Sequence, residues 1–145
     1  MKTLSEANKK LEELIVSTVE KGNESHDNKS YEDALKEYFR AWALLPEPKL
    51  EWEIASWISA CMYSAYFDMA AFAKAKEWAE IALKTRGSDI DTAPLVDLGM
   101  VCFELNSLDE SYNYFDAAYN YGKARSFKER PKKYLDFYLS EKKKR

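Results

Sequence analysis

The sequence predicts an all-α protein built from paired helices, and three observations support this fold class. The 145-residue chain contains only four Gly and four Pro, so few positions interrupt regular structure. Hydrophobic residues are 46% of the composition and aromatic residues 14%, which is enough for a buried core and more than a disordered chain carries. Apolar residues also recur every three to four positions along most of the chain, the spacing of one helix face.

Capping residues, prolines and polar clusters divide the chain into seven expected helices. Thr3–Glu6 and Ser107–Glu110 have the spacing of a capping box, a hydroxyl residue followed three positions later by Glu, and each opens a helix. Pro46 ends the second helix because proline cannot continue one, and Pro94 and Pro131 fit the first turns of the fifth and seventh. The expected helices lie near residues 4–27, 31–45, 50–67, 71–85, 91–106, 107–122 and 128–141.

Three of these helices share one pattern of large and small side chains. In each, a small residue follows a large apolar residue by three positions, and Ala lies at position +10. The small residues, Ala34, Ala75 and Ser111, lie 41 and 36 residues apart. Small residues allow two antiparallel helices to approach closely while the large ones interlock, so the repeat predicts stacked helix pairs.

The first pair carries the fullest version of the pattern, in Gly22, Tyr31, Ala34, Tyr38, Ala41 and Pro46. These residues and the spacing resemble the tetratricopeptide repeat, a helix–turn–helix unit of about 34 residues with Gly, aromatic, Ala, aromatic, Ala and Pro at those positions. The resemblance covers roughly residues 15–123. It is less close in the second pair, where Tyr63 replaces the Gly and Gly87 the Pro, and in the third, where Ser111 replaces an Ala.

The resemblance implies a right-handed helical-repeat solenoid of about three antiparallel helix pairs in a single domain, closed by a C-terminal capping helix. We expect the basic tail after the capping helix to fray. The expected limits are 1–145 for the domain, 4–46, 50–87 and 92–122 for the pairs, 128–141 for the capping helix and 142–145 for the tail.

Charge is distributed unevenly along the sequence. Residues 1–122 carry 12 basic and 22 acidic side chains, a net charge of −10. Residues 123–145 carry 10 basic and 3 acidic side chains, a net charge of +7. Any proposed function therefore has to explain why an acidic body carries a basic C-terminal end.

The sequence lacks the signals of catalysis, cofactor binding and membrane targeting. His26 is the single histidine, the four glycines form no phosphate-binding loop, and no metal-ligand spacing occurs. Cys61 and Cys102 are expected to be small buried thiols. We therefore predict a protein that is not an enzyme and uses no metal and no cofactor. Because no apolar run reaches the length of a membrane span and the N-terminus lacks a secretory signal, we expect a cytoplasmic location.

The resemblance also implies a binding surface for another polypeptide. In the family, the first helix of each pair lines a concave groove, and five positions of that helix point into it. The positions correspond to Val16, Val19, Asn23, His26 and Asp27 in the first pair, Trp57, Ala60, Ser64, Phe67 and Asp68 in the second, and Ala93, Val96, Met100, Phe103 and Glu104 in the third.

This set predicts an apolar floor with an acidic rim. Such a groove would suit a basic protein partner with apolar anchors, attracted by the acids and held by the aromatic residues. The alternative is that the aromatics belong to the core and the acids are ordinary helix-end charges. The floor would comprise Trp57, Phe67, Met100 and Phe103, and the rim Asp27, Asp68 and Glu104.

One kind of partner is not expected. Some tetratricopeptide co-chaperones bind the C-terminal tail of heat-shock chaperones through a clamp of Lys, Asn and Arg that holds the terminal carboxylate. The corresponding residues are Val19, Asn23, Cys61, Ala93 and Asp97, of which only Asn23 fits. Asp97 would repel a carboxylate.

The leading hypothesis is therefore a protein–protein interaction module, with two alternatives. A small acidic protein of this type could act as a bacterial immunity protein or antitoxin, because toxins that cleave nucleic acid must be basic. Alternatively, the basic and aromatic segment 123–145 could bind nucleic acid or a membrane surface, although the acidic body opposes binding to a polyanion.

Overall fold

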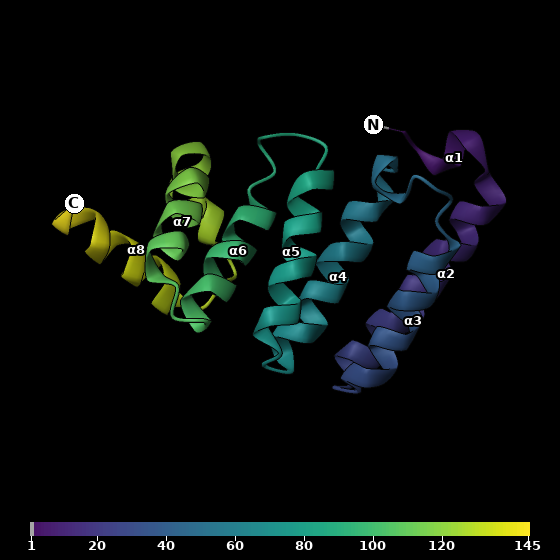
Figure 1. The fold of residues 1–145 in the computed structure, drawn as a ribbon, viewed down its shortest axis with the longest axis horizontal. Coiled ribbons are helices and arrows are strands. Elements are labelled where there is room, and N and C mark those ends of the chain that lie inside the picture. The colour runs from purple at the N-terminus through teal and green to yellow at the C-terminus, as the bar shows by residue number, and fades with distance from the viewer. Residues whose placement is uncertain (1) are drawn as a thin grey trace. The chain divides into compact units, whose positions relative to one another are not determined.

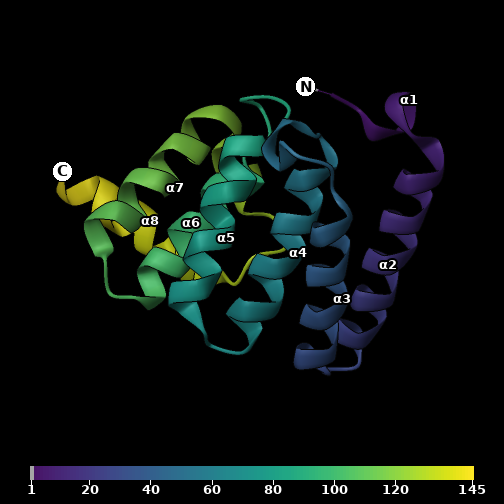
Figure 2. The same ribbon diagram turned by 45° about the vertical axis from the view of Figure 1, so that its right-hand side comes forward.

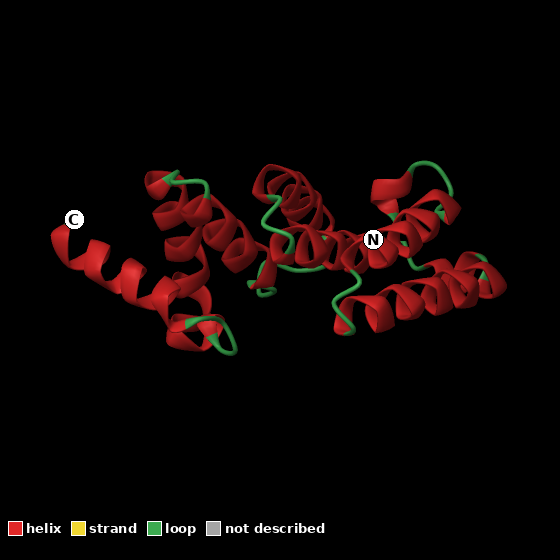
Figure 3. Ribbon diagram, turned by 90° about the horizontal axis from the view of Figure 1, so that it is seen from below, coloured by secondary structure: helices red, strands yellow, loops and turns green. Residues whose placement is uncertain are grey.

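The computed structural model describes residues 2–145 and confirms the all-α prediction. Over these residues the only strand-like feature is an isolated bridge between Lys2 and Trp52, and Figure 3 shows helices joined by loops. In chain order (Figure 1) the elements are α1 (Leu4–Ala7), α2 (Lys9–Asp27), α3 (Tyr31–Leu44), the 3-10 helix η1 (Lys49–Glu51), α4 (Ile54–Asp68), α5 (Phe72–Thr85), α6 (Ala93–Glu104), α7 (Leu108–Gly122), the 3-10 helix η2 (Lys123–Phe127) and α8 (Lys132–Lys144).

The helices pack in the pairs that the sequence predicts, within two compact units that are described separately. Unit 1 ends at Gly87 and contains the α2–α3 and α4–α5 pairs, with α3 also packed against α4. Unit 2 covers Ser88–Arg145 and contains the α6–α7 pair and α8. Figures 1 and 2 both show α2 and α3 side by side. The single domain expected over residues 1–145 stays a prediction.

The same backbone turn joins the two helices of each pair. In the first pair the amide of Lys29 donates to the carbonyl of His26, and the amide of Ser30 donates to the carbonyl of Ser25. These two bonds form a Schellman motif, in which the residue after the helix takes a left-handed conformation. The bonds recur in the other pairs, and the left-handed residues are Lys29 (φ 63°), Ala70 (φ 58°) and Asn106 (φ 61°), spaced 41 and 36 residues apart like the small residues of the sequence pattern.

Glycine on the first helix makes room for an aromatic ring on the second. A Cβ atom added at Gly22 would lie 2.5 Å from the Tyr38 ring, and one added at Gly99 would overlap the Phe115 ring. The second pair reverses these sizes, because buried Tyr63 stands at the glycine position and buried Ala79 at the aromatic position. The large side chain of Tyr63, which departs from the repeat pattern, is therefore compensated by the small side chain of Ala79 on the facing helix.

The expected capping boxes lie at helix starts but do not form. Thr3 and Ser107 are the N-cap residues of α1 and α7, and neither side chain makes a cap hydrogen bond. At Ser107 the preceding turn sets ψ to 70°, away from the extended conformation in which a cap side chain usually reaches the helix amides. Asn8 instead caps α2, where its Oδ1 accepts from the Leu11 amide at 3.1 Å, so the single helix expected over 4–27 is broken at Asn8.

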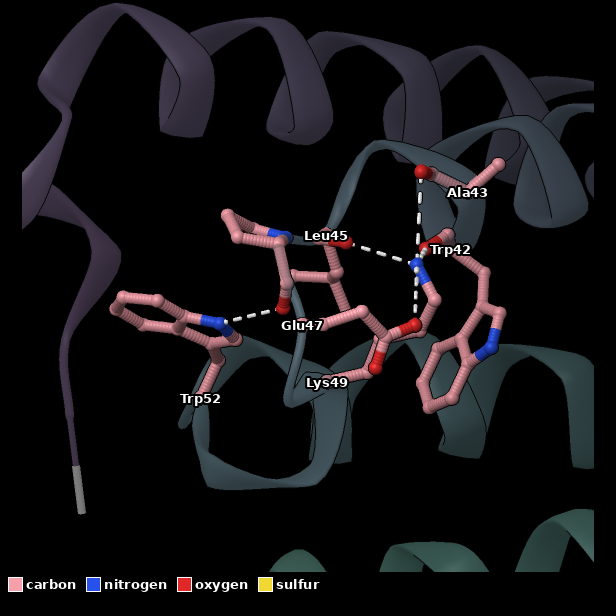
Figure 4. Close-up of polar contacts among 7 residues, drawn as sticks. Trp42, Ala43, Leu45, Glu47, Lys49 and Trp52 are labelled. Atoms are coloured by element: carbon pink, nitrogen blue, oxygen red, sulfur yellow. Dashed lines mark hydrogen bonds and ion pairs between the residues drawn. The ribbon is translucent and has the colours of Figure 1, made fainter.

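Lys49 and Trp52 fix the chain where it leaves the first pair (Figure 4). Lys49 Nζ donates to the carbonyls of Trp42 at 3.0 Å and Leu45 at 2.8 Å, at the end of α3 where carbonyls lack their usual helical partners. The Trp52 indole Nε1 donates to the Pro46 carbonyl at 2.9 Å. These contacts direct the chain into α4.

Helix α8 differs from its predicted form at both ends. It begins at Lys132 rather than near 128, because η2 and the extended residue Pro131 precede it. It continues to Lys144, and the Arg145 guanidinium lies 4.1 Å from the centre of the Tyr112 ring and 3.1 Å from Asp109. In the structure the helix therefore continues through most of the residues expected to form a frayed tail. No helix within residues 2–145 is long and apolar enough to span a bilayer.

Candidate partner-binding surface

In unit 1 the predicted binding residues of α2 and α4 lie on neighbouring helices. We call them the first-helix surface. Trp57 is 37% exposed, Asp27 and Asp68 are also exposed, and the others are half-buried. The first-helix surface comprises Val16, Asn23, His26, Asp27, Trp57, Ala60, Ser64, Phe67 and Asp68.

A hydrogen bond joins the C-terminal ends of α2 and α4. His26 Nε2 lies 2.7 Å from Asp68 Oδ2, although the two residues are 42 positions apart in the sequence. The His26 ring also meets Tyr31 edge-on, with ring centres 5.4 Å apart. The structure therefore brings together two predicted binding residues from different pairs, and holds His26 by a carboxylate and an aromatic ring.

Three predicted binding residues have roles inside the protein. Val19 and Val96 have no exposed surface, so their prediction as partner contacts is wrong. Asn23 is half-buried, and its Oδ1 accepts a hydrogen bond from the Tyr38 hydroxyl at 2.7 Å. Burial raises the pKa of the Tyr38 hydroxyl, which keeps it protonated as the donor. Asn23 thus supports the packing of α2 on α3.

The aromatic residues of α4 differ in their surroundings. Phe67 packs against Tyr63 and Phe72, with ring centres 5.5 and 5.2 Å away, and is half-buried. Trp57 belongs to the exposed large hydrophobic residues. Since Trp57, Ser64 and Asp68 recur at near-helical spacing, they follow one stripe of α4.

In unit 2 the predicted binding residues contact α8. The Phe103 ring meets Tyr134 and Phe137 edge-on, with centres 5.4 and 5.1 Å away. Glu104 accepts from the Tyr134 hydroxyl at 2.8 Å and pairs with Lys133 at 3.0 Å. At the end of α6, these contacts favour the interpretation as packing aromatic and structural acid for the half-buried Phe103 and Glu104.

Nearer the start of α6, Arg130 contacts another predicted binding residue, Met100, and the acid Asp97, whose burial the sequence analysis did not predict. Its guanidinium lies 3.2 Å from the Met100 sulfur and 2.5 Å from Asp97 Oδ1. Burial raises the pKa of the Asp97 carboxyl, and Arg130 acts in the opposite direction. The available signal was an acid within an otherwise apolar helix, which requires a partner when it is buried.

The acids at the ends of the first helices are not explained by helix stability. Asp27, Asp68 and Glu104 are the last residues of α2, α4 and α6. The negative end of the helix dipole disfavours acids there. Asp68 and Glu104 bond to His26 and to Lys133 and Tyr134, whereas Asp27 is exposed. The last position of each first helix therefore carries a carboxylate despite the dipole.

The two cysteine side chains are in environments that favour packing over reactivity. Burial raises the pKa of the Cys61 thiol to about 11, so it is protonated at neutral pH and a poor nucleophile. Cys102 is fully buried. Within residues 2–145 no group of three or more His, Cys, Asp or Glu residues is placed to hold a metal ion.

Comparison with known proteins supports the fold. No protein-family model and no curated protein matches the chain. Among solved structures, the chain is similar to the N-terminal domain of stress-induced protein-1 (STI-1) from C. elegans, with a TM-score of 0.69 over 88% of this chain and 96% of that one. The sequence identity is 16%, so the similarity shows a helical-repeat fold alone and says nothing about activity.

Proposed function

We propose that this protein is a tetratricopeptide-like module without catalytic activity that binds a polypeptide partner on the first-helix surface of unit 1. The observation that carries the proposal is the exposure of Trp57 on the same stripe of α4 as Asp68, a carboxylate placed where the helix dipole disfavours it. Tryptophan is enriched among the residues that contribute most to binding energy in protein interfaces. The helical-repeat fold agrees with this use.

The proposed partner is basic and carries apolar anchors. Residues 1–87 hold 12 basic and 15 acidic side chains, so unit 1 has a net charge of −3. Two acids of the first-helix surface, Asp27 and Asp68, are exposed at helix ends. Exposed acids attract a basic partner during encounter, and desolvated aromatic contacts then slow its dissociation.

The C-terminal carboxylate of a heat-shock chaperone does not suit the residues at the clamp positions. Val19 is buried, Asn23 Oδ1 is used by Tyr38, and Asp97 is paired with Arg130. These positions supply no lysine or arginine to hold a carboxylate.

The basic C-terminal segment has a use within unit 2. Lys142 lies over the Tyr119 ring at 5.1 Å, Arg145 lies over Tyr112, and Lys133 pairs with Glu104. These contacts favour a structural role for this segment over binding of nucleic acid or a membrane surface.

Selection of displayed random peptides against the full chain tests the proposed surface. We expect enrichment of basic peptides with aromatic or aliphatic anchors. The Trp57→Ser variant should bind a selected peptide at least about tenfold more weakly, as expected for a hot-spot residue. Phe39→Ser is the matched control, because Phe39 is 44% exposed on the second helix α3. Unchanged affinity in Trp57→Ser would contradict the proposal.

The immunity-protein alternative makes a separate prediction about stoichiometry. A tight 1:1 complex with one basic protein, measured by calorimetry, would indicate neutralisation of that protein. Weak binding to several unrelated peptides would indicate an adaptor instead.

A further inference from the structure

A cavity at one end of unit 1 adjoins the first-helix surface. It is widely open to solvent and has a volume of about 380 Å³, which is large enough for one long side chain. It lies where the turn between α2 and α3 comes near the end of α4. Its lining residues are Lys29, Ser30, Tyr31, Glu32, Asp33 and Met69.

The cavity continues the acidic side of the first-helix surface. Tyr31 contacts His26, which is bonded to Asp68, and Met69 follows Asp68 directly. The ends of α2 and α4, both negative ends of helix dipoles, are thus beside the cavity.

The lining combines carboxylates with groups that suit a guanidinium. Glu32 and Asp33 are exposed in the first turn of α3, where they also stabilise that helix, so their presence alone identifies no ligand. The half-buried Tyr31 ring and the Met69 thioether, which is on a residue 37% exposed, add a flat π face and a polarisable atom. A planar guanidinium can stack on a ring and donate two parallel hydrogen bonds to a carboxylate at the same time, a geometry that a lysine ammonium lacks.

We propose that this cavity receives an arginine side chain of the partner polypeptide. The inference rests on the proposed function and names the chemistry that one end of the first-helix surface recognises. Lys29 is the basic residue of the lining, and its charge opposes the arginine. The site therefore makes two opposite predictions: removing the carboxylates weakens binding, and removing the Lys29 charge strengthens it.

The test uses NMR titration of the full isotope-labelled chain with N-acetylargininamide, and with N-acetyllysinamide at the same charge and salt. We expect the arginine probe to shift the amides of Ser30, Tyr31 and Asp33, with affinity at least about threefold above that of the lysine probe. Glu32→Gln with Asp33→Asn should weaken the arginine probe at least about fivefold.

Two further variants test whether a damaged fold or a change in net charge could explain the loss of binding. Lys29→Asn keeps a residue that tolerates the left-handed turn, and should bind the arginine probe about twofold or more tightly, which a damaged fold would not produce. Glu12→Gln with Glu13→Gln removes the same charge from the start of α2 and should leave affinity unchanged. Equal affinity for both probes, shifts elsewhere on the chain, or no gain in Lys29→Asn would overturn the arginine site.

The peptide selection separates the two proposals. If selected peptides bind in a Trp57-dependent way but show no arginine enrichment and no effect of the Glu32 and Asp33 changes, the arginine site is wrong and the proposed function stands. If no peptide is selected while the arginine probe binds as described, the proposed function is wrong and the cavity is a site for free guanidinium compounds only.

Discussion

At the scale of single residues, the fold depends on pairs of positions that share one volume between two helices. Gly22 faces Tyr38 and Gly99 faces Phe115, whereas Tyr63 and Ala79 occupy the same two positions with the sizes exchanged. Because interiors are close-packed, either arrangement fills the space, but a change on one side alone does not. The combined volume of the two facing side chains is therefore what the three pairs have in common.

The first prediction concerns Gly22→Ala. Alanine is the better helix former by about 1 kcal/mol, yet its Cβ would lie 2.5 Å from the Tyr38 ring. We expect a net loss of about 2 kcal/mol in the free energy of unfolding, the usual cost of overpacking, measured by urea denaturation. Gly87→Ala is the control and should be near neutral, because nothing lies within 4 Å of its added Cβ. A stabilised Gly22→Ala variant would show that the Tyr38 ring moves aside freely.

The second prediction concerns the buried Arg130–Asp97 pair. Arg130→Met leaves a carboxylate that is largely buried without its cation, and we expect a loss of about 2 kcal/mol at pH 8. Burial raises the pKa of Asp97 above its unfolded value, so the folded state binds the extra proton. Stability is then retained near the unfolded pKa of about 4 and lost as the pH rises through the higher folded value.

The measurement is urea unfolding of Arg130→Met and the wild type at pH 4.5 and pH 8. The deficit should be smaller at the lower pH, and adding Asp97→Asn should remove the dependence on pH. A deficit that is the same at both pH values would mean that Asp97 stays ionised without Arg130.

At the scale of elements, the same position of a first helix is used in different ways by the two units. Phe67 and Asp68 end α4 and Phe103 and Glu104 end α6, with the same turn after each. In unit 2, α8 covers Phe103 and bonds to Glu104. Helix α8 is therefore needed to complete the packing of α6.

The third prediction compares two aromatic residues of first helices. Phe103→Ala removes ring contacts to Tyr134 and Phe137 and should lower the free energy of unfolding by about 3 kcal/mol. Trp57→Ala removes an exposed side chain and should cost less than about 1 kcal/mol. Both values come from urea unfolding followed by circular dichroism. A large loss of stability in Trp57→Ala would make Trp57 a core residue and remove it from the proposed surface.

At the scale of the whole molecule, the net charge of −3 comes from an acidic sequence with a basic end. Part of this basic charge is engaged within unit 2, because Lys133, Lys142 and Arg145 contact aromatic rings or acids of that unit. We therefore expect the exposed acids of the first-helix surface to attract a basic partner.

The fourth prediction is an effect on association rate. Asp27→Lys with Asp68→Lys should slow association of a selected basic peptide about five- to tenfold at low salt, with little difference at high salt where charges are screened. Stopped-flow fluorescence measures the rate. Glu77→Lys with Glu80→Lys, on the second helix α5, makes the same change in net charge and should slow association less. Equal slowing by both double variants would mean that net charge alone governs the encounter.

Much of the fold could be predicted from local pattern. The spacing of Ala34, Ala75 and Ser111 predicted the pairs, and the turns recur at the same spacing. The break at Asn8 was not predictable from periodicity, because apolar residues continue through it. The capping box at Ser107 does not form because the turn before that residue sets its backbone. The site was predicted less well: the exposed positions of Trp57, Asp27 and Asp68 agree with the pattern, whereas Val19, Val96, Phe103 and Glu104 serve packing.

The helices and their pairing follow from the sequence alone, because they depend on residues a few turns apart along the chain. The exposure of the first-helix side chains and the contact of His26 with Asp68 across 42 positions depend on the folded arrangement. Exposure depends on what distant segments cover, and a helix such as α8 can occupy a face whose local pattern equals that of an open one.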